Sequence, residues 1–336
     1  MVVANERRLF MKSFKLYVLM FMVTTSSVFA QTRLIKIDGS STVFPITEAV
    51  SEEFQTLKKG TVQVTVGISG TGGGFKKFCR GETDIQDASR PISKEEMKTC
   101  KDSGIQYIEL PIAYDAITLC VSQKNTWLSE LSLPELKKIW EPQAQRKIIQ
   151  WNQVKKEWPE TPLKLFGAGS DSGTFDYFTE AVNGKSKASR GDYTASEDDN
   201  TLVLGIGQDP NALGYLPFSY YEANKAKLKA IAIINTKNKA ILPSLKTIVN
   251  GAYEPFSRPI FIYVNVTSLK KSEVKDYVTF YLTQAQTLVP QVKYVPLSPK
   301  AYQADLTRLQ KNKIGTTFGG EAHIGMKIED LLLQTH

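Results

Sequence analysis

Apolar residues recur along the chain with two periods, one typical of strands and one typical of helices. Runs of β-type apolar residues predict strands at 34–37, 62–68, 163–166, 228–234 and 259–264. Apolar residues at helical spacing predict helices at 46–57, 133–140, 175–182, 272–287 and 299–311. Strands and helices alternate through the chain, and this order predicts α/β domains.

The length of the chain, 336 residues, predicts two hydrophobic cores, because ordinary single domains are shorter. Two apolar segments are suited to connect two such units. Residues 110–119 are rich in β-type residues and are interpreted as the passage from the first unit to the second. Residues 259–264 are interpreted as the return crossing. No interior segment of the sequence approaches the length of a membrane span.

The first thirty residues have the layout of a secretory signal peptide. Basic residues at 7, 8, 12 and 15 precede an apolar run at 16–23. Val28 and Ala30 then occupy the two positions that a signal peptidase inspects. We therefore predict a signal peptide at residues 1–30, cleavage after Ala30 and a periplasmic location. An uncleaved membrane anchor is the alternative, which the short apolar run disfavours.

The charge of the mature chain is mildly basic. Residues 1–30 hold four basic residues and one acidic residue, so 38 basic and 33 acidic residues remain, a net charge of +5. These charges are spread evenly, and no basic stripe is interleaved with aromatic residues. This distribution argues against nucleic acid as a partner.

The chain has three cysteines, Cys79, Cys100 and Cys120. In an oxidising compartment we expect a disulfide between Cys79 and Cys100, which flank the same predicted unit. Cys120 lies in an apolar stretch and is interpreted as a buried thiol. Because only His323 and His336 could join these cysteines as ligands, we predict no metal site and no cofactor.

Three stretches place a hydroxyl- or glycine-rich turn between a strand and a helix. They are 38–45 (Asp-Gly-Ser-Ser-Thr-Val-Phe-Pro), 69–74 (Ser-Gly-Thr-Gly-Gly-Gly) and 167–175 (Gly-Ala-Gly-Ser-Asp-Ser-Gly-Thr-Phe). Helix N-termini carry unpaired N–H donors and the positive end of the helix dipole, so they suit an anion. One such turn could be only a well-capped helix, whereas three in one chain predict a site. Residues 69–74 lack the Gly-Lys-Ser/Thr of a nucleotide-binding loop, which disfavours nucleotide hydrolysis.

A fourth polar stretch, 84–92 (Asp-Ile-Gln-Asp-Ala-Ser-Arg-Pro-Ile), supplies a candidate cation. Arg90 stands between Ser89 and Pro91 at the end of a short strand-like run. A guanidinium fork matches the geometry of an oxyanion and stays charged. Many neutral donors with little formal charge suit the binding of a small oxyanion without chemistry.

An oxyanion hole of a hydrolase would use similar donors, so an enzyme is the alternative class. A serine hydrolase needs a general base next to its nucleophile. His323 is the only non-terminal histidine, and it lies in a loop-like segment. Neither 67–71 nor 171–173 reads as a nucleophile elbow without such a partner. We therefore predict a binding protein with no catalytic residues.

These stretches, in this order, resemble the secreted phosphate-binding proteins of high-affinity phosphate ABC transporters. The matching segments are 38–45, 69–75, 84–92, 171–178, 213–215 and 315–320, which span nearly the whole mature chain. The resemblance implies a two-lobed periplasmic-binding-protein fold of type II that closes on phosphate about two hinge strands. Lobe 1 would comprise 31–113 and 262–336, lobe 2 would comprise 114–261, and the ligand would lie between them.

The resemblance also implies a set of phosphate ligands. From the first lobe these are Ser41, Thr42, the Val43 amide, Ser69, Thr71, Ser89 and Arg90. From the second lobe they are Ser172, Gly173 and Thr174. The implied partner is an ABC-type permease, served by a monomer. Receptors for sulfate or molybdate, and a phosphate-ester hydrolase on the same fold, are the alternatives.

Two positions depart from the pattern of that family. Many members have an aspartate where this chain has Ser89, and an arginine where it has 168–169 (Ala-Gly). Arg90 is therefore expected to supply the charge from the other lobe. An aspartate acceptor can select phosphate over fully ionised sulfate by demanding a proton on the ligand. Asp87, Asp115 and Asp171 are candidates for that acceptor, and Asp171 is included in the predicted ligand set.

Overall fold

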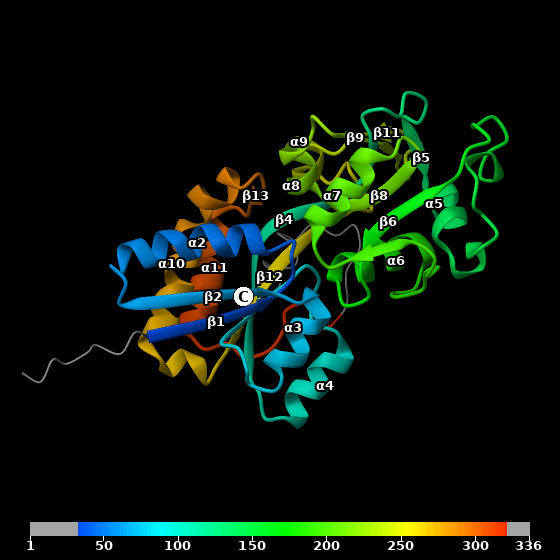
Figure 1. The fold of residues 1–336 in the computed structure, drawn as a ribbon. Helices are drawn as coiled ribbons and strands as arrows, with labels where there is room; N and C mark the ends of the chain where they lie inside the picture. Colours follow the sequence, from blue (N-terminus) through cyan, green and yellow to red (C-terminus); the bar gives the residue numbers. More distant parts are fainter. Residues whose placement is uncertain (1–32, 321–336) are drawn as a thin grey trace, which may run out of the picture. The chain divides into compact units, whose positions relative to one another are not determined.

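The computed structural model of this chain describes residues 33–320, shown in Figure 1. The predicted signal peptide, its cleavage site and His323 lie outside the described residues. Within the described range, ten strands form one mixed sheet, in which the main order is β2-β1-β3-β12-β4-β8-β6-β7. No helix of this range is long and apolar enough to cross a membrane.

The first part of the sheet is built from short parallel strands joined by helices. The strands are β1 (Arg33–Gly39), β2 (Val62–Ile68) and β3 (Ile85–Ala88). The helices are α2 (Phe44–Leu57), α3 (Gly70–Phe78) and α4 (Lys94–Asp102). Because β1 pairs in parallel with both β2 and β3, the carboxyl ends of all three strands meet at one edge of the sheet.

Two long antiparallel strands form the middle of the sheet, β4 (Tyr107–Ser122) and β12 (Ser257–Asn265). They contain the two segments that the sequence marks as crossings, 110–119 and 259–264. β12 also pairs with β3, while the end of β4 pairs with β8 (Ala212–Pro217) and β9 (Leu228–Ala230). The β4–β12 ladder has a bulge, because the register shifts between Ile260 and Phe261.

The remaining elements extend the sheet or cover it. Beyond β8 lie β6 (Lys164–Ala168) and β7 (Thr194–Ser196), with α5 (Leu133–Trp140), α6 (Gly173–Asn183), α7 (Asp199–Gln208) and α8 (Phe218–Ala223). A small second sheet contains β5 (Glu130–Ser132), β10 (Ala232–Ile234) and β11 (Ala240–Ile241), followed by α9 (Leu245–Val249). The chain continues through α10 (Ser272–Gln291), β13 (Val295–Pro296) and α11 (Pro299–Gln310). Short 3-10 turns lie at Pro142–Ala144, Trp151–Gln153 and Ser268–Lys270.

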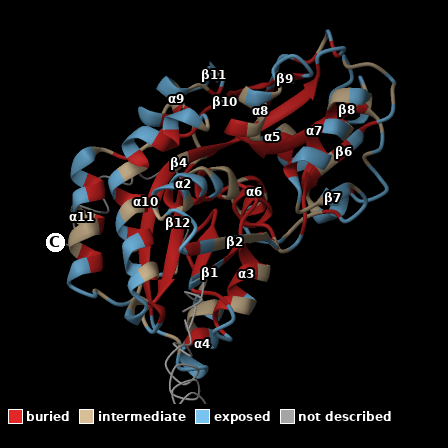
Figure 2. Ribbon diagram, turned by 60° about the vertical axis from the view of Figure 1, so that its left-hand side comes forward, coloured by how far each residue is buried: buried red, intermediate tan, exposed pale blue. Residues whose placement is uncertain are grey.

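Two large hydrophobic clusters lie along this sheet. The first core draws its residues from 35–113 and 260–318, and the second draws them from 116–256 with Val295. A smaller cluster packs α7 against β4 and β8. Figure 2 shows buried residues along the strands and exposed residues on the outer sides of α10 and α11. Below, "first-core side" and "second-core side" refer to the elements that contribute to each large cluster.

The structure differs from the sequence prediction in two places. Residues 228–234 form two strands, β9 and β10, which belong to different sheets, whereas the apolar run predicts one. Residues 70–78 form the helix α3 although four of its nine residues are glycines, which are poor helix formers. Tertiary packing overrides that propensity, because a Cβ on Gly74 would lie 2.1 Å from Gln86 Oε1.

The predicted disulfide is confirmed. Cys79, which ends α3, is bonded to Cys100 of α4, so the two helices are tied together. Cys120 is buried in β4 and unpaired, and burial raises the pKa of its thiol. This thiol therefore stays protonated at neutral pH, as the interpretation of a buried, inert cysteine requires.

Candidate functional site

Three helix N-termini meet where the first-core and second-core sides touch. The Thr42 hydroxyl before α2 lies 3.1 Å from the Thr174 hydroxyl in α6. In α3, the Thr71 hydroxyl lies 3.2 Å from that of Ser89. A Cβ on Gly173 would lie 2.5 Å from both the Thr71 and Ser89 hydroxyl oxygens. We call these five buried residues, Thr42, Thr71, Ser89, Gly173 and Thr174, the helix-start cluster.

Two of the three helices in this cluster begin without a side-chain cap. The side chains of Val43, before α2, and Ser69, before α3, accept no hydrogen bond from their helices. By contrast, Ser93 and Ser132 cap α4 and α5 with their hydroxyl oxygens. Ser172 caps α6 by accepting from the Thr174 N–H at 3.1 Å. Backbone oxygens accept from the first turns of α2 and α3 instead: those of Ser40 and Val43 at α2, and that of Asp171 from the Gly72 N–H of α3. A ligand at these helices would take the place of such bonds.

The segment before α2 turns sharply at Gly39, whose φ of +144° favours glycine. The Val43 N–H, a predicted ligand, donates to the Ser40 carbonyl oxygen at 3.1 Å in this structure. The Ser41 hydroxyl donates to Asp199 Oδ2 at 2.8 Å, at the start of α7. Ser41 therefore joins the two sides next to the cluster, although its hydroxyl hydrogen is directed at Asp199.

Two other predicted ligands have partners elsewhere. The Ser69 hydroxyl donates to Asp38, a carboxylate that also accepts from Lys77 Nζ at 2.6 Å. The Asp171 carboxylate is partly exposed and pairs with Lys76 Nζ at 2.9 Å. Both the carboxylate and the backbone of Asp171 therefore join the two sides, because Lys76 lies in α3 and the Asp171 carbonyl oxygen accepts from the Gly72 N–H at 2.7 Å.

Arg90 is buried, but two carboxylates surround its guanidinium. Nη1 and Nη2 each donate to one oxygen of Glu96 at 2.8 Å, and Nε donates to Asp176 Oδ2 at 2.8 Å. Nη1 also donates to the Pro91 carbonyl oxygen at 3.0 Å. Burial disfavours the charged form, but Glu96 and Asp176 raise the pKa of Arg90 above its ordinary value. This arginine links β3 to α6 as an ion-pair clasp.

A second buried arginine, Arg258, lies directly beside the helix-start cluster. It stands in β12 opposite Asp115 of β4, and both side chains are fully buried. Its Nε and Nη2 donate to Asp115 Oδ2 at 3.1 and 2.9 Å, and Nη2 also donates to the Thr174 hydroxyl at 2.8 Å. Arg258 is not among the ligands predicted from the sequence. Its one distinguishing feature there is that it directly precedes the apolar run 259–264.

Several buried carboxyl groups near the cluster have raised pKa values. Burial raises the pKa of Asp199 to about 7, against the stabilising hydrogen bond from Ser41. Burial also raises the pKa of Asp115, an effect that Arg258 opposes. Asp87 has a pKa raised by burial to about 8, but it lies near Thr47 of α2 and Tyr281 of α10. Of the three proposed acceptors, Asp115 is the one whose carboxylate accepts from Arg258, which in turn donates to Thr174 of the cluster.

Comparisons with known proteins agree on one family. A model of the PBP superfamily domain matches residues 26–285. Protein SphX of Synechococcus elongatus is 52% identical over 303 residues, which are 90% of this chain and 89% of SphX. The phosphate-binding protein PstS of Staphylococcus saprophyticus is 37% identical over 278 residues, 82% of this chain and 84% of that protein. The chain belongs to the PBP superfamily.

Two solved structures extend the comparison to the fold. A possible phosphate-binding protein from Planctomyces limnophilus is 44% identical, with a TM-score of 0.62 over 83% of this chain and 98% of that one. A putative phosphate ABC transporter substrate-binding protein from Clostridium perfringens, solved with bound phosphate, is 26% identical, with a TM-score of 0.66 over 79% of this chain and 100% of that one. The mixed α/β periplasmic-binding-protein fold expected from the sequence is therefore confirmed.

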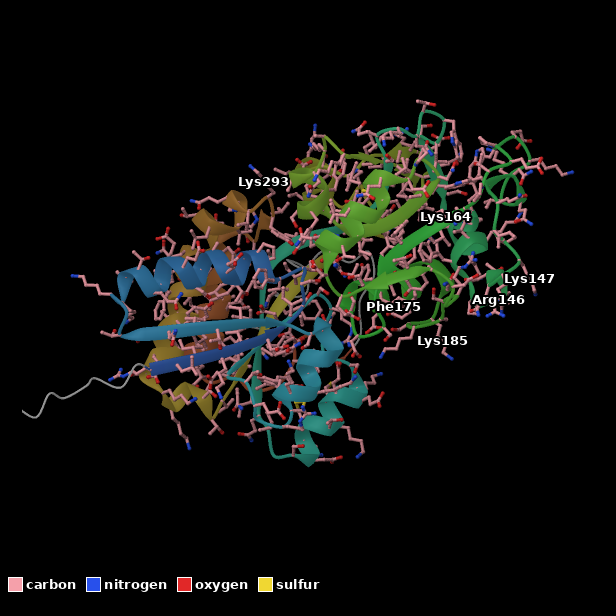
Figure 3. The ribbon with its side chains drawn as sticks, viewed as in Figure 1. Arg146, Lys147, Lys164, Phe175, Lys185 and Lys293 are labelled. Atoms are coloured by element: carbon pink, nitrogen blue, oxygen red, sulfur yellow. A yellow bond between two sulfur atoms is a disulfide. The ribbon has the colours of Figure 1, made fainter. Side chains whose placement is uncertain are left out.

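In this PBP-superfamily chain, a cavity of about 810 Å³ opens beside the helix-start cluster. Its lining comes from both core sides and includes Gly72, Arg90, Asp171 and Asp176. Lys76, Lys94 and Lys187 also line this cavity. Figure 3 shows other basic side chains, Arg146, Lys147 and Lys185, extending outward on exposed segments. The cavity thus gives solvent a path toward the seam between the two sides.

The chemistry available in the described residues is that of binding. They contain no group of three or more His, Cys, Asp or Glu side chains placed to hold a metal ion. The helix-start cluster offers hydroxyl and backbone donors with one buried guanidinium beside it. Such fixed dipoles can replace the hydration shell of a small oxyanion.

Proposed function

We propose that this chain captures inorganic phosphate in the helix-start cluster and delivers it to an ABC-type permease. The convergence of three helix N-termini from both core sides on five small or hydroxyl-bearing residues carries this proposal. The names of the relatives support it, since PstS is a phosphate-binding protein and the Clostridium perfringens structure holds phosphate. A tetrahedral oxyanion matches donors that approach from several directions.

The proposed ligand set keeps most of the sequence prediction. It contains Thr42, Val43, Thr71, Ser89, Ser172, Gly173 and Thr174. Four further residues stay predictions from the sequence: Ser41, Ser69, Arg90 and Asp171. In this structure their side chains form hydrogen bonds or ion pairs with other protein side chains. The Val43 N–H would exchange its bond to Ser40 for one to the ligand.

We further propose that the protein works by closing two lobes, 31–113 with 262–336 and 114–261. The two hydrophobic clusters support this division, because each would give one lobe its own core. The strands β4 and β12 would serve as hinges, since they run from one cluster to the other. Closure brings α6 to the starts of α2 and α3, so that donors from both lobes surround the ligand.

We propose a binding protein rather than a phosphate-ester hydrolase. The Ser172 hydroxyl oxygen accepts from the helix that it caps, and residues 33–320 contain no histidine to act as its base. The proposed setting is periplasmic, with the signal peptide removed after Ala30 and the mature protein acting as a monomer. The family of the relatives supports this setting.

Calorimetric titration tests the proposed function. The mature protein, freed of any co-purified ligand, should bind phosphate saturably at neutral pH and should bind sulfate and molybdate much more weakly. A heat of binding observed with sulfate or molybdate but not with phosphate would favour a receptor for another oxyanion. Turnover of a generic phosphate ester that Ser172→Ala abolishes would favour the enzyme.

A further inference from the structure

Positive charge is scarce around the helix-start cluster. The cluster itself supplies only hydroxyl groups and backbone N–H donors, all of them neutral. Lys76 and Lys77, in the last turn of α3, are paired with Asp171 and Asp38. Two buried arginines, Arg90 and Arg258, are the charged groups that remain to be compared.

The guanidinium of Arg90 is committed to other anions. Its Nε, Nη1 and Nη2 each donate a hydrogen bond to a carboxylate oxygen at 2.8 Å, and Nη1 also donates to a carbonyl oxygen. One positive charge is thus shared by Glu96 and Asp176, so the group as a whole carries a net negative charge. A phosphate oxygen would have to displace a buried carboxylate, which would leave that charge unpaired.

The guanidinium of Arg258 is only partly committed. It has one carboxylate partner, Asp115, which makes a pair of zero net charge. Among the described residues, Nη1 makes one hydrogen bond, to the Gly173 carbonyl oxygen at 3.4 Å. Both hydrogens of Nη2 are used, by Asp115 at 2.9 Å and by the Thr174 hydroxyl at 2.8 Å, and the Thr42 hydroxyl at 3.5 Å adds only a long contact. The Nη1 distance exceeds the usual 2.7–3.2 Å of an N–H···O bond, so a better acceptor could replace the Gly173 carbonyl oxygen.

The position of Arg258 is firmly held. Asp115 accepts from Nε and Nη2 along one edge of the guanidinium, and the Tyr177 ring lies 5.7 Å from its central carbon. Both partners lie on regular elements: Asp115 on β4, which pairs with β12 (Figure 1), and Tyr177 on α6. Nη1 therefore faces Gly173 of the second-core side, while Nη2 lies near Thr42 of the first-core side.

We propose that Arg258 is the cation that binds phosphate in the helix-start cluster, donating to the ligand through Nη1. This inference rests on the proposed function. A phosphate oxygen takes the place of the long contact to the Gly173 carbonyl oxygen, while Asp115 and the Thr174 hydroxyl hold Nη2 and keep the guanidinium oriented. Because Arg258 stands between Phe256 of the second core and Ile260 of the first, the charge stays at the seam whether the protein is open or closed.

The test compares phosphate titrations of the wild type, Arg258→Met, Arg258→Lys and the control Arg190→Met. Arg190 is also buried and pairs with one aspartate, Asp192, but its remaining bonds go to backbone oxygens of 139 and 148. We expect Arg258→Met to weaken phosphate binding at least 100-fold. Arg258→Lys should lose less, because lysine keeps the charge but lacks the fork. Arg190→Met should stay within threefold of the wild type.

A double variant guards against a folding defect. Arg258→Met leaves Asp115 buried and unpaired, so Arg258→Met with Asp115→Asn removes both charges together. Circular dichroism should show it folded, and it should bind phosphate at least 100-fold more weakly than the wild type. Binding within tenfold of the wild type by either methionine variant would overturn this inference alone. Absence of phosphate binding to the wild type would overturn the proposed function and this inference with it.

Discussion

Arg90 and Arg258 are both buried and both join the two core sides, yet they hold different partners. Arg90 is enclosed by Glu96 and Asp176, so every one of its nitrogens donates to a carboxylate. Arg258 has one carboxylate and otherwise touches two hydroxyl groups and a carbonyl oxygen. The number of carboxylates around a buried arginine therefore separates an ion-pair clasp from a group that can receive an anion.

The comparison also shows what residue type and motif position do not reveal about an arginine, namely its partners in the folded chain. Arg90 lies within a polar motif and has the right chemistry, but Glu96 and Asp176 come from α4 and α6 and are paired with it only in the folded chain. Arg258 lies in no motif. Its distance from Asp115 along the chain is 143 residues, and only the β4–β12 register brings them together.

The largest expected effect is on stability, from Arg90→Met. The change leaves Glu96 and Asp176 buried without their cation, which should lower the free energy of unfolding by about 3–5 kcal/mol. Urea unfolding measures it, with Arg80→Met as the control, since Arg80 and Glu82 form an exposed pair. Phosphate affinity should fall less than tenfold. A loss of affinity as large as that of Arg258→Met would erase the distinction between the two arginines.

Gly173→Ala should weaken phosphate binding about 100-fold, close to 3 kcal/mol. A Cβ at this position would lie 2.5 Å from the Thr71 and Ser89 hydroxyl oxygens, so the two core sides could not meet. The matched control is Gly191→Ala, where a Cβ would approach only Gln145 Oε1, at 3.6 Å. Titration calorimetry measures both. Equal affinities for the two variants would mean that the ligand does not need the close approach beside Arg258.

Asp199→Asn should change how stability depends on pH, by on the order of 2 kcal/mol at pH 8. The pKa of Asp199 is about 7 in the folded protein and near 4 in an unfolded chain, so folding favours the protonated form. Its contribution is fully present below about pH 4 and is lost as pH rises through 7. Urea unfolding at pH 5 and pH 8 should therefore show the variant gaining on the wild type at the higher pH. Parallel pH profiles would contradict this.

The same experiment sharpens the role of Arg258. The positive charge of Arg258 acts to lower the pKa of Asp199, and the negative charge of Asp115 acts to raise it. Arg258→Met should therefore raise the pKa of Asp199, so that the loss of folding stability caused by its ionisation is completed at a higher pH. Arg190→Met serves again as the control and should leave the pH profile unchanged.

The smallest effect is expected from Lys76→Ala. Lys76 pairs with Asp171 across the same seam as Arg90 and Asp176, but its side chain is 64% exposed. Solvent screens such a pair, so the change in stability should stay below about 1 kcal/mol and should shrink further in high salt. Urea unfolding at two salt concentrations measures it. An effect equal to that of Arg90→Met would show that burial does not decide the strength of these pairs.

Sequence patterns were sufficient for the elements that depend on local signals. The helix at 133–140 has the bounds of α5, and the crossing segments fall inside β4 and β12. The starts of α2 and α6 were marked by hydroxyl residues and, for α2, by a proline in the first turn. The helix after 69–74 was expected, but α3 begins inside that glycine run, at Gly70, where Gly74 packs closely against Gln86 of β3 and Gly39 of β1. The lobe boundaries stay a prediction.

The bulge between Ile260 and Phe261 has a consequence for insertions and deletions. Ile260 faces Ala113 and Phe261 faces Pro111, so Ile112 has no opposite residue in β12. Successive side chains of a strand point to opposite faces, and loss of one residue reverses every side chain beyond it. Deletion of Ile112 would therefore straighten the ladder and keep Asp115 opposite Arg258, whereas deletion of Tyr114 would place Asp115 opposite Pro259 and turn it away from Arg258. The number of residues between the bulge and Asp115 thus decides which face of the sheet the Asp115 side chain points to. We expect natural insertions and deletions to avoid this segment.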